Sequence, residues 1–160
     1  KSLKLFSSLD ILSHREIKSR YIVDLQEYTM KVQIEARTLG DISTNHIIPT
    51  AINYQNTLIE NVRGLKEIYG AGYKKYANEQ ISLIERISEH ISAIISGVDS
   101  MISSRKNANQ ETDDYKKAIL YSTEVLTKMN PIRYHCDKLE LLVDNNLWPL
   151  AKYRELLFSC

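Results

Sequence analysis

The residues of this 160-residue chain with the greatest potential for chemistry are its four histidines. Di-metal sites in helical bundles use the pattern Glu-x-x-His, which places both ligands on one helical face toward the core. The residues three positions before the histidines are Ile11, Ser43, Ile87 and Ile132. None of them is a carboxylate, so the sequence excludes this class of metal site.

His135 and Cys136 are adjacent and could form half of a zinc site, but no second Cys/His pair stands at a suitable spacing. Cys136 falls on an apolar stripe, which favours a buried small hydrophobic residue over a ligand or nucleophile. His46 lies close to Pro49. It is either part of a site at a kink or, more simply, a packed histidine bonded to a carbonyl that the proline frees.

Tyr69, Tyr73 and Tyr76 flank Lys74 and Lys75 around a Gly-Ala-Gly turn. Aromatic rings interleaved with lysines can bind single-stranded nucleic acid or phosphate. However, this turn lacks a phosphate-cradling glycine pattern and a preceding strand. We therefore interpret the cluster as a cap on the end of a helical bundle, and we predict no catalytic, cofactor-binding or metal-binding residue anywhere in the chain.

Charge and composition narrow the class of protein further. The 21 basic and 20 acidic residues leave a formal charge of +1, which argues against nucleic acid as a main partner. Adjacent basic residues such as Arg105-Lys106 are interpreted as parts of solvent-exposed helix faces. Two cysteines, Cys136 and Cys160, do not make a disulfide framework. No signal peptide opens the chain and no apolar run approaches the ~20 residues of a membrane helix. We expect a soluble cytoplasmic domain without a membrane partner.

The element that must position these residues is a very long first helix, predicted over residues 13–69. Ser13 followed by Glu16 forms a capping-box pattern at its start, and Gly70 and Gly72 end it. Pro49 interrupts it, so the helix either kinks there or consists of two helices meeting at Ile48; the kink is favoured because the apolar pattern continues on both sides. The stripe that predicts it comprises Tyr21, Leu25, Tyr28, Val32, Leu39, Ile42, Leu58, Val62, Leu65 and Tyr69.

Two more long helices are predicted, over residues 73–105 and 112–143, joined by a polar loop over Asn107 to Thr112. The second helix has two heptad seams, and the third is capped by Thr112, Asp113 and Asp114 and bends at Pro131. The second helix's seams are Ala77, Ile84, Ile91 and Val98, and Gln80, Ile87, Ile94 and Met101; the third helix's stripe is Tyr115, Ile119, Ser122, Val125 or Leu126, Met129, Ile132, Cys136, Leu139 and Val143.

The predicted fold is all-α: an antiparallel bundle of three long helices, with the tail 144–160 and its only tryptophan, Trp148, packing across it and a short helix near Lys152 to Leu157. An unusually apolar leader, residues 1–12, precedes the bundle. The first helix would span about 85 Å and the others about 50 Å each. Its early turns, from Ser13 to about Met30, should therefore project beyond the bundle with an apolar stripe that needs a partner.

Three segments resemble the C-terminal helical region of type III glutamine synthetases. They are Ser13-His-Arg-Glu-Ile-Lys-Ser-Arg-Tyr21 with Ile34-Glu-Ala-Arg-Thr-Leu39; Ile47-Ile-Pro-Thr-Ala51 leading to Tyr54; and Lys138-Leu-Glu-Leu-Leu-Val-Asp144 with Leu147-Trp-Pro149 and Tyr153-Arg-Glu-Leu-Leu-Phe158. Residues 73–121 match only as amphipathic helix. Ala151 stands where a second proline is expected.

The resemblance implies a parent enzyme that joins ammonia to glutamate using ATP and magnesium or manganese, with stacked hexameric rings. In that family the catalytic residues belong to preceding domains whose motifs do not occur here, so no catalytic residue carries over. We expect this fragment to be non-catalytic, to contain no cofactor, and to contact the catalytic domain of its own chain and sister subunits as a homo-oligomer. The alternative is a free-standing helical adaptor or scaffold with no enzymatic activity.

Overall fold

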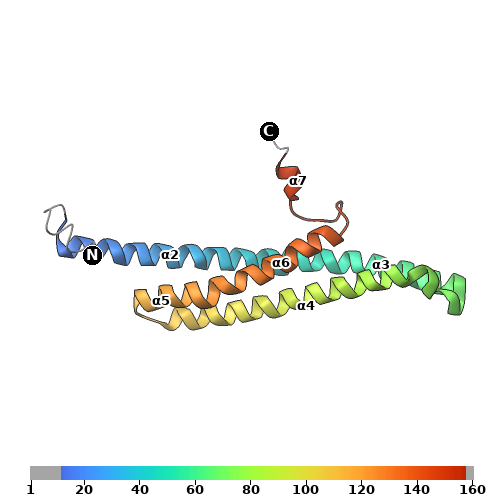
Figure 1. Ribbon diagram of the computed structural model, residues 1–160, viewed down its shortest axis with the longest axis horizontal. Helices are drawn as coiled ribbons and strands as arrows, with labels where there is room; N and C mark the ends of the chain where they lie inside the picture. Colours follow the sequence, from blue (N-terminus) through green and yellow to red (C-terminus); the bar gives the residue numbers. More distant parts are fainter. Residues whose placement is uncertain (1–11, 158–160) are drawn as a thin grey trace.

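The computed structural model describes residues 12–157, and every regular element in that range is helical (Figure 1). Three long helical stretches pack side by side, as the sequence predicts, so the all-α three-helix fold is confirmed. The apolar leader, except for Leu12, lies outside the described residues.

The first stretch consists of α2 (His14–Ile42), a π-helical segment η1 (Ser43–Ile47) and α3 (Ile48–Tyr69). It begins at the predicted capping box: the Ser13 hydroxyl accepts a hydrogen bond from the Glu16 backbone N–H at 3.3 Å, and the Glu16 carboxylate accepts one from the Ser13 backbone N–H at 2.8 Å. These two bonds satisfy donors that a helix start otherwise leaves free.

Pro49 does not break this stretch into two separate helices. Ile47 and Ile48 keep right-handed helical backbone angles, and the Ile48 N–H bonds the Ser43 carbonyl, five residues back. The π turn ends at Ile47, two positions before Pro49. In a standard α-helix the proline ring would clash with a carbonyl group of the preceding turn. A wider π turn is a common cause of helix bending. Figure 1 shows α2 and α3 following one another along the length of the molecule.

A tight turn joins the first stretch to the second. Gly70 adopts φ = +54°, a conformation that favours glycine, and a short 3₁₀ segment, η2 (Gly70–Gly72), leads into α4 (Lys74–Gln110). The turn is short, so α4 runs back along α3. Both predicted seams of α4 face the core. In one seam Ala77, Ile91 and Val98 are buried, and in the other Ile87, Ile94 and Met101 are; Ile84 and Gln80 are partly buried.

The predicted polar loop over Asn107 to Thr112 is wrong, because α4 continues to Gln110. Ala108 is fully buried, and the Asn109 side-chain oxygen accepts a 2.7 Å hydrogen bond from the Tyr121 hydroxyl. These tertiary contacts outweigh the weak helix propensity of asparagine. The turn that follows is short: Glu111 accepts hydrogen bonds from the N–H groups of Thr112 and Asp113.

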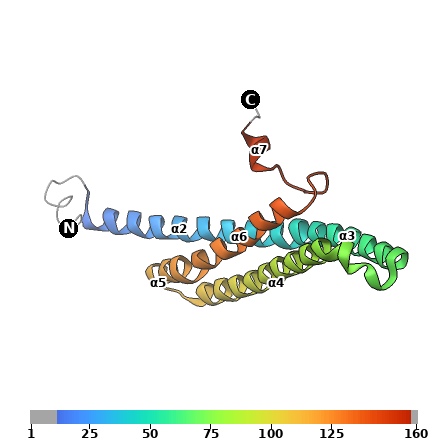
Figure 2. The ribbon, with the colours of Figure 1, turned by 45° about the vertical axis from the view of Figure 1, so that its right-hand side comes forward.

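The third stretch consists of α5 (Asp114–Leu120), a second π-helical segment η3 (Tyr121–Val125) and α6 (Leu126–Leu142), which contains Pro131. Asp113 caps it by accepting a hydrogen bond from the Lys116 N–H at 2.9 Å. The stretch runs antiparallel to α4, and α5 contacts α2 (Figure 2).

The predicted stripe of this third stretch is correct after Val125 and wrong before it. Tyr115, Ile119 and Ser122 are exposed, whereas Ala118 and Tyr121 are buried. The π turn between Tyr121 and Val125 holds one residue more than an α turn. Residues on its N-terminal side are therefore rotated relative to the register that a continuous α-helix would give.

The tail packs on the core through Trp148, which is 9% exposed, and through Lys152. The Lys152 ammonium donates to the Glu140 carbonyl at 2.8 Å and to the Asn145 side-chain oxygen, and lies 5.8 Å from the centre of the Trp148 ring. The short helix α7 (Tyr153–Leu156) then stands out from the bundle (Figures 1 and 2).

The first turns of α2 project beyond the bundle (Figure 1). The Gln26 amide donates to the Asp114 carboxylate at 3.2 Å and marks where α5 begins to cover α2. The buried residues of α2 are Thr29, Val32 and Ala36, all beyond this point.

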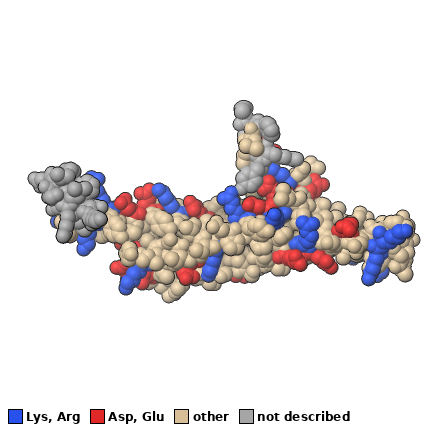
Figure 3. Space-filling view, viewed as in Figure 1, with Lys and Arg blue, Asp and Glu red and all other residues tan. Residues whose placement is uncertain are grey.

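The surface carries charges of both signs: Figure 3 shows basic and acidic side chains interspersed over the visible face. Among the described residues, no helix combines the length and the apolar character that crossing a membrane requires.

Candidate functional site

Cys136 faces the core from α6, as the sequence predicts. It is 6% exposed, and its sulfur lies 3.5 Å from the hydroxyl of Ser43, a fully buried residue of η1. Burial raises the pKa of the Cys136 thiol, which opposes formation of the nucleophilic thiolate. The interpretation of Cys136 as a buried small residue is confirmed.

His135, the neighbour of Cys136, has a partner that the sequence does not reveal. Its Nδ1 lies 3.0 Å from Nδ1 of His90 on α4, so one imidazole donates to the other. The Tyr134 ring meets His135 edge-on, with ring centres 5.2 Å apart. Burial lowers the pKa of His90, and the nearby charges of His135, Arg86 and Lys138 lower it further, while Glu89 opposes them.

The histidine pair joins two helices and positions an imidazole hydrogen bond at their contact. Within residues 12–157, His, Cys, Asp and Glu side chains form no cluster of three or more that could hold a metal ion. Two imidazoles alone fall short of the three or four protein ligands typical of zinc sites. The arrangement therefore supports a role in helix packing.

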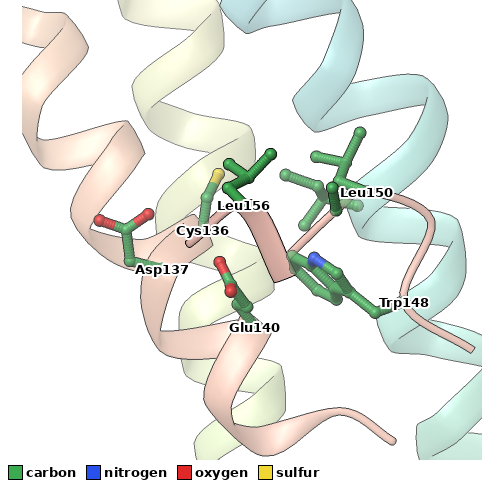
Figure 4. A pocket seen from close by; sticks show the side chains of 8 residues that line it. Cys136, Asp137, Glu140, Trp148, Leu150 and Leu156 are labelled. Atoms are coloured by element: carbon green, nitrogen blue, oxygen red, sulfur yellow. The ribbon is translucent and has the colours of Figure 1, made fainter. Parts of the chain in front are cut away.

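A small cavity lies beside Cys136, between α6, η1 and the tail (Figure 4). Its volume is about 230 Å³. Figure 4 shows Asp137 and Glu140 on one side and Trp148 and Leu150 on the other. The walls are mainly apolar with two carboxylates, a lining suited to a small apolar or cationic group. The thiol of Cys136, whose pKa is raised, also lines the cavity.

His46 is exposed, so the predicted packed histidine near Pro49 is wrong. The π turn presents Ser43 and Ile47 to the core and leaves His46 on the outer side.

Where α3 turns into α4, the Tyr69 and Tyr76 rings stack across the glycine turn with centres 4.4 Å apart. The Lys66 ammonium lies 5.9 Å from the Tyr73 ring centre. These contacts match the interpretation of a helix-end cap.

Comparison of the sequence with known proteins shows which family this chain resembles. Residues 1–66 match the family model described as the glutamine synthetase C-terminal domain. The chain is 44% identical over 150 residues to a glutamine synthetase of Bacteroides fragilis, covering 93% of this chain and 21% of that protein. It is 28% identical to the type-3 glutamine synthetase of Dictyostelium discoideum over 99% of this chain and 22% of the relative.

A glutamine synthetase of Butyrivibrio fibrisolvens is 23% identical over 99% of this chain and 22% of its own length. The chain thus spans about a fifth of the length of the curated relatives that it matches. The matches to relatives extend along nearly the whole chain, including the helices beyond residue 66. The chain belongs to the family of glutamine synthetase C-terminal domains.

Proposed function

We propose that this chain is a non-catalytic bracing and assembly domain of a glutamine synthetase. The parent enzyme would join ammonia to glutamate in the cytoplasm, using ATP and magnesium or manganese ions held by other domains. The relatives are several times longer than this chain, which favours this function over a free-standing adaptor.

The observation that carries the proposal is a second apolar face on α2. Val23, Met30 and Ile34 follow one another at spacings of seven and four, so they share a side of the helix. They are 58%, 54% and 56% exposed. Val32, which is buried, stands two positions from both Met30 and Ile34, on the nearly opposite side.

One face of α2 thus packs against the bundle while the other presents large apolar side chains to solvent. The exposed Glu27–Lys31 ion pair lies among these apolar side chains, so the face is amphipathic. Large exposed apolar side chains rimmed by charged ones favour a contact with another protein surface. The partners we propose are the catalytic domain of the same chain and sister subunits in a homo-oligomer.

Two measurements test the proposal. In the full-length enzyme, Val23→Asp with Met30→Asp should produce smaller assemblies in sedimentation velocity and reduce glutamine formation. The isolated chain should form no glutamine when it is given glutamate, ammonia, ATP and magnesium ions. Glutamine formation by the isolated chain, or unchanged assembly of the double variant, would count against the proposed role.

A further inference from the structure

A second cavity, distinct from the one beside Cys136, lies where the end of α2 and η1 face α4. Its volume is about 260 Å³. We call it the arginine groove, defined by Arg37, Asp41, Thr44, Asn45, Ile102 and Arg105. The two arginines come from different helices and are 68 positions apart, so only the packing of α2 on α4 brings them to one site.

The two guanidinium groups of the groove have no carboxylate partner in the part of the chain that the structure describes. Among the described residues, neither Arg37 nor Arg105 forms an ion pair. Asp41, the acidic residue of the described lining, accepts a 2.5 Å hydrogen bond from the Asn45 amide. The lining therefore carries two positive charges against one negative charge.

The two arginines also converge on the same neighbour. Both of their charges act on the Tyr121 hydroxyl, where they oppose the rise in pKa that burial causes. That hydroxyl is neutral and donates to Asn109, so it gives the guanidinium groups no compensating negative charge. The positive charges thus stand together beside an apolar wall that includes Val98 and Ile102.

From this geometry we propose that the arginine groove binds a small oxyanion, a phosphate group or a carboxylate, between Arg37 and Arg105. The planar guanidinium fork matches both groups and can bond them with two parallel hydrogen bonds. The Thr44 hydroxyl is a further donor in the lining, and the Asn45 amide has one hydrogen left beside the one that it donates to Asp41. The cavity is smaller than the ~300 Å³ at which pockets for drug-sized ligands begin, which suits a single anionic group.

The test is an NMR titration of the isotope-labelled 160-residue chain with inorganic phosphate at constant ionic strength, and in a second arm with succinate. The side-chain Nε–H signals of Arg37 and Arg105 should shift together and saturate. Saturation with phosphate alone assigns the site to phosphate groups, and saturation with succinate alone assigns it to carboxylates. Shifts that grow linearly with both ligands would overturn the proposal.

Matched variants separate a built site from general attraction. Arg37→Gln and Arg105→Gln should each weaken the saturable binding about tenfold, as loss of a charged hydrogen-bonding partner predicts. Lys106→Gln removes the same charge from the neighbouring exposed position and should leave binding unchanged. Equal weakening by all three variants would refute the assignment. Arg37→Lys keeps the positive charge but loses the planar guanidinium group that can form two parallel hydrogen bonds. This variant should bind the anion more weakly than the native chain.

Discussion

Gly97 on α4 shows how closely α4 and α6 approach at single-residue scale. A Cβ atom built on Gly97 would lie 2.9 Å from Cγ1 of Ile132, which is itself 1% exposed. That distance is too short for two carbon atoms, and a buried β-branched side chain cannot easily move aside. The close packing of these two helices therefore depends on the missing side chain.

We predict that Gly97→Ala lowers the free energy of unfolding by about 1 kcal/mol. The overlap with Ile132 costs roughly 1–3 kcal/mol, which exceeds the gain of about 1 kcal/mol that alanine brings to a helix interior. Gly64 on α3 is the matched control, because nothing lies within 4 Å of its added Cβ. Gly64→Ala should raise the same free energy by about 0.5–1 kcal/mol. Urea unfolding measures both, and a stabilised Gly97→Ala would contradict the packing argument.

The histidine pair gives the chain a pH dependence near neutrality. The pKa of His90 is lowered from 6.5 in the folded chain, chiefly by burial. As the pH falls, the unfolded chain therefore takes up this proton first. The stability that neutral His90 contributes is fully present above pH 6.5 and is lost progressively as the pH falls through the lower folded-state pKa.

We predict that His90→Gln flattens the change in unfolding free energy between pH 7.5 and about pH 5.5. In the native chain, a second proton on His90 would place a positive charge in a partly buried site beside His135, Arg86 and Lys138, and Glu89 compensates only in part. The exposed His46 provides the control, because His46→Gln removes a histidine without touching the pair. Urea unfolding at several pH values measures the slopes, and equal slopes for the native chain and His90→Gln would contradict the prediction.

Sequence reasoning located some of these residues and missed others for a clear reason. Cys136 sits on a helical stripe, and that local spacing is enough to predict its burial. The partner of His135 is 45 positions away on another helix, and no local pattern encodes such a pair. The arginine groove has the same origin: Arg105, interpreted from sequence as part of a solvated face, faces Arg37 only after the helices pack.

At the scale of elements, the two π turns separate what the sequence could predict from what it could not. Helix identity, the capping box and the heptad seams of α4 follow from spacing along one helix. A π turn inserts one residue without any signal in composition, so the register of α5 could not be extended backward from α6. Pro49, in the first turn of α3, did mark the region of η1, but η3 ends six residues before Pro131.

We predict that deleting Glu124, an exposed residue of η3, is tolerated far better than deleting an exposed residue of a regular turn. Without Glu124, Tyr121 and Val125 become three positions apart and still share one face. Deleting Asn130 in α6 instead rotates the later core residues, such as Ile132 and Leu139, away from the core, a loss of several kcal/mol. Thermal unfolding followed by circular dichroism compares the two deletions. Equal destabilisation would show that η3 is not an inserted residue in an otherwise regular helix.

At the scale of the whole molecule, the unequal helix lengths were predictable. They leave the first turns of α2 without a neighbour among residues 12–157. The sequence predicts an overhang to about Met30, and the structure covers α2 from about Gln26 onward. The exposed outer face that includes Val23 and Met30 was not predicted, because sequence reading followed only the single stripe that packs on the bundle. Among residues 12–157, no element covers the side of α2 that presents Val23 and Met30.

We predict that the isolated chain self-associates reversibly through this outer face, because burying Val23 and Met30 removes apolar surface from water. Sedimentation velocity over a range of concentrations should show the weight-average mass rising for the native chain. Val23→Asp with Met30→Asp should hold it at the monomer while leaving the unfolding midpoint nearly unchanged, since both positions are exposed. Ile52→Asp with Ile59→Asp, a pair at the same spacing on α3 that is 43% and 39% exposed, supplies the matched control and should still associate. A native chain that stays strictly monomeric would mean that the outer face of α2 has no affinity for a second copy, and would leave the catalytic domain of its own chain as the partner to test.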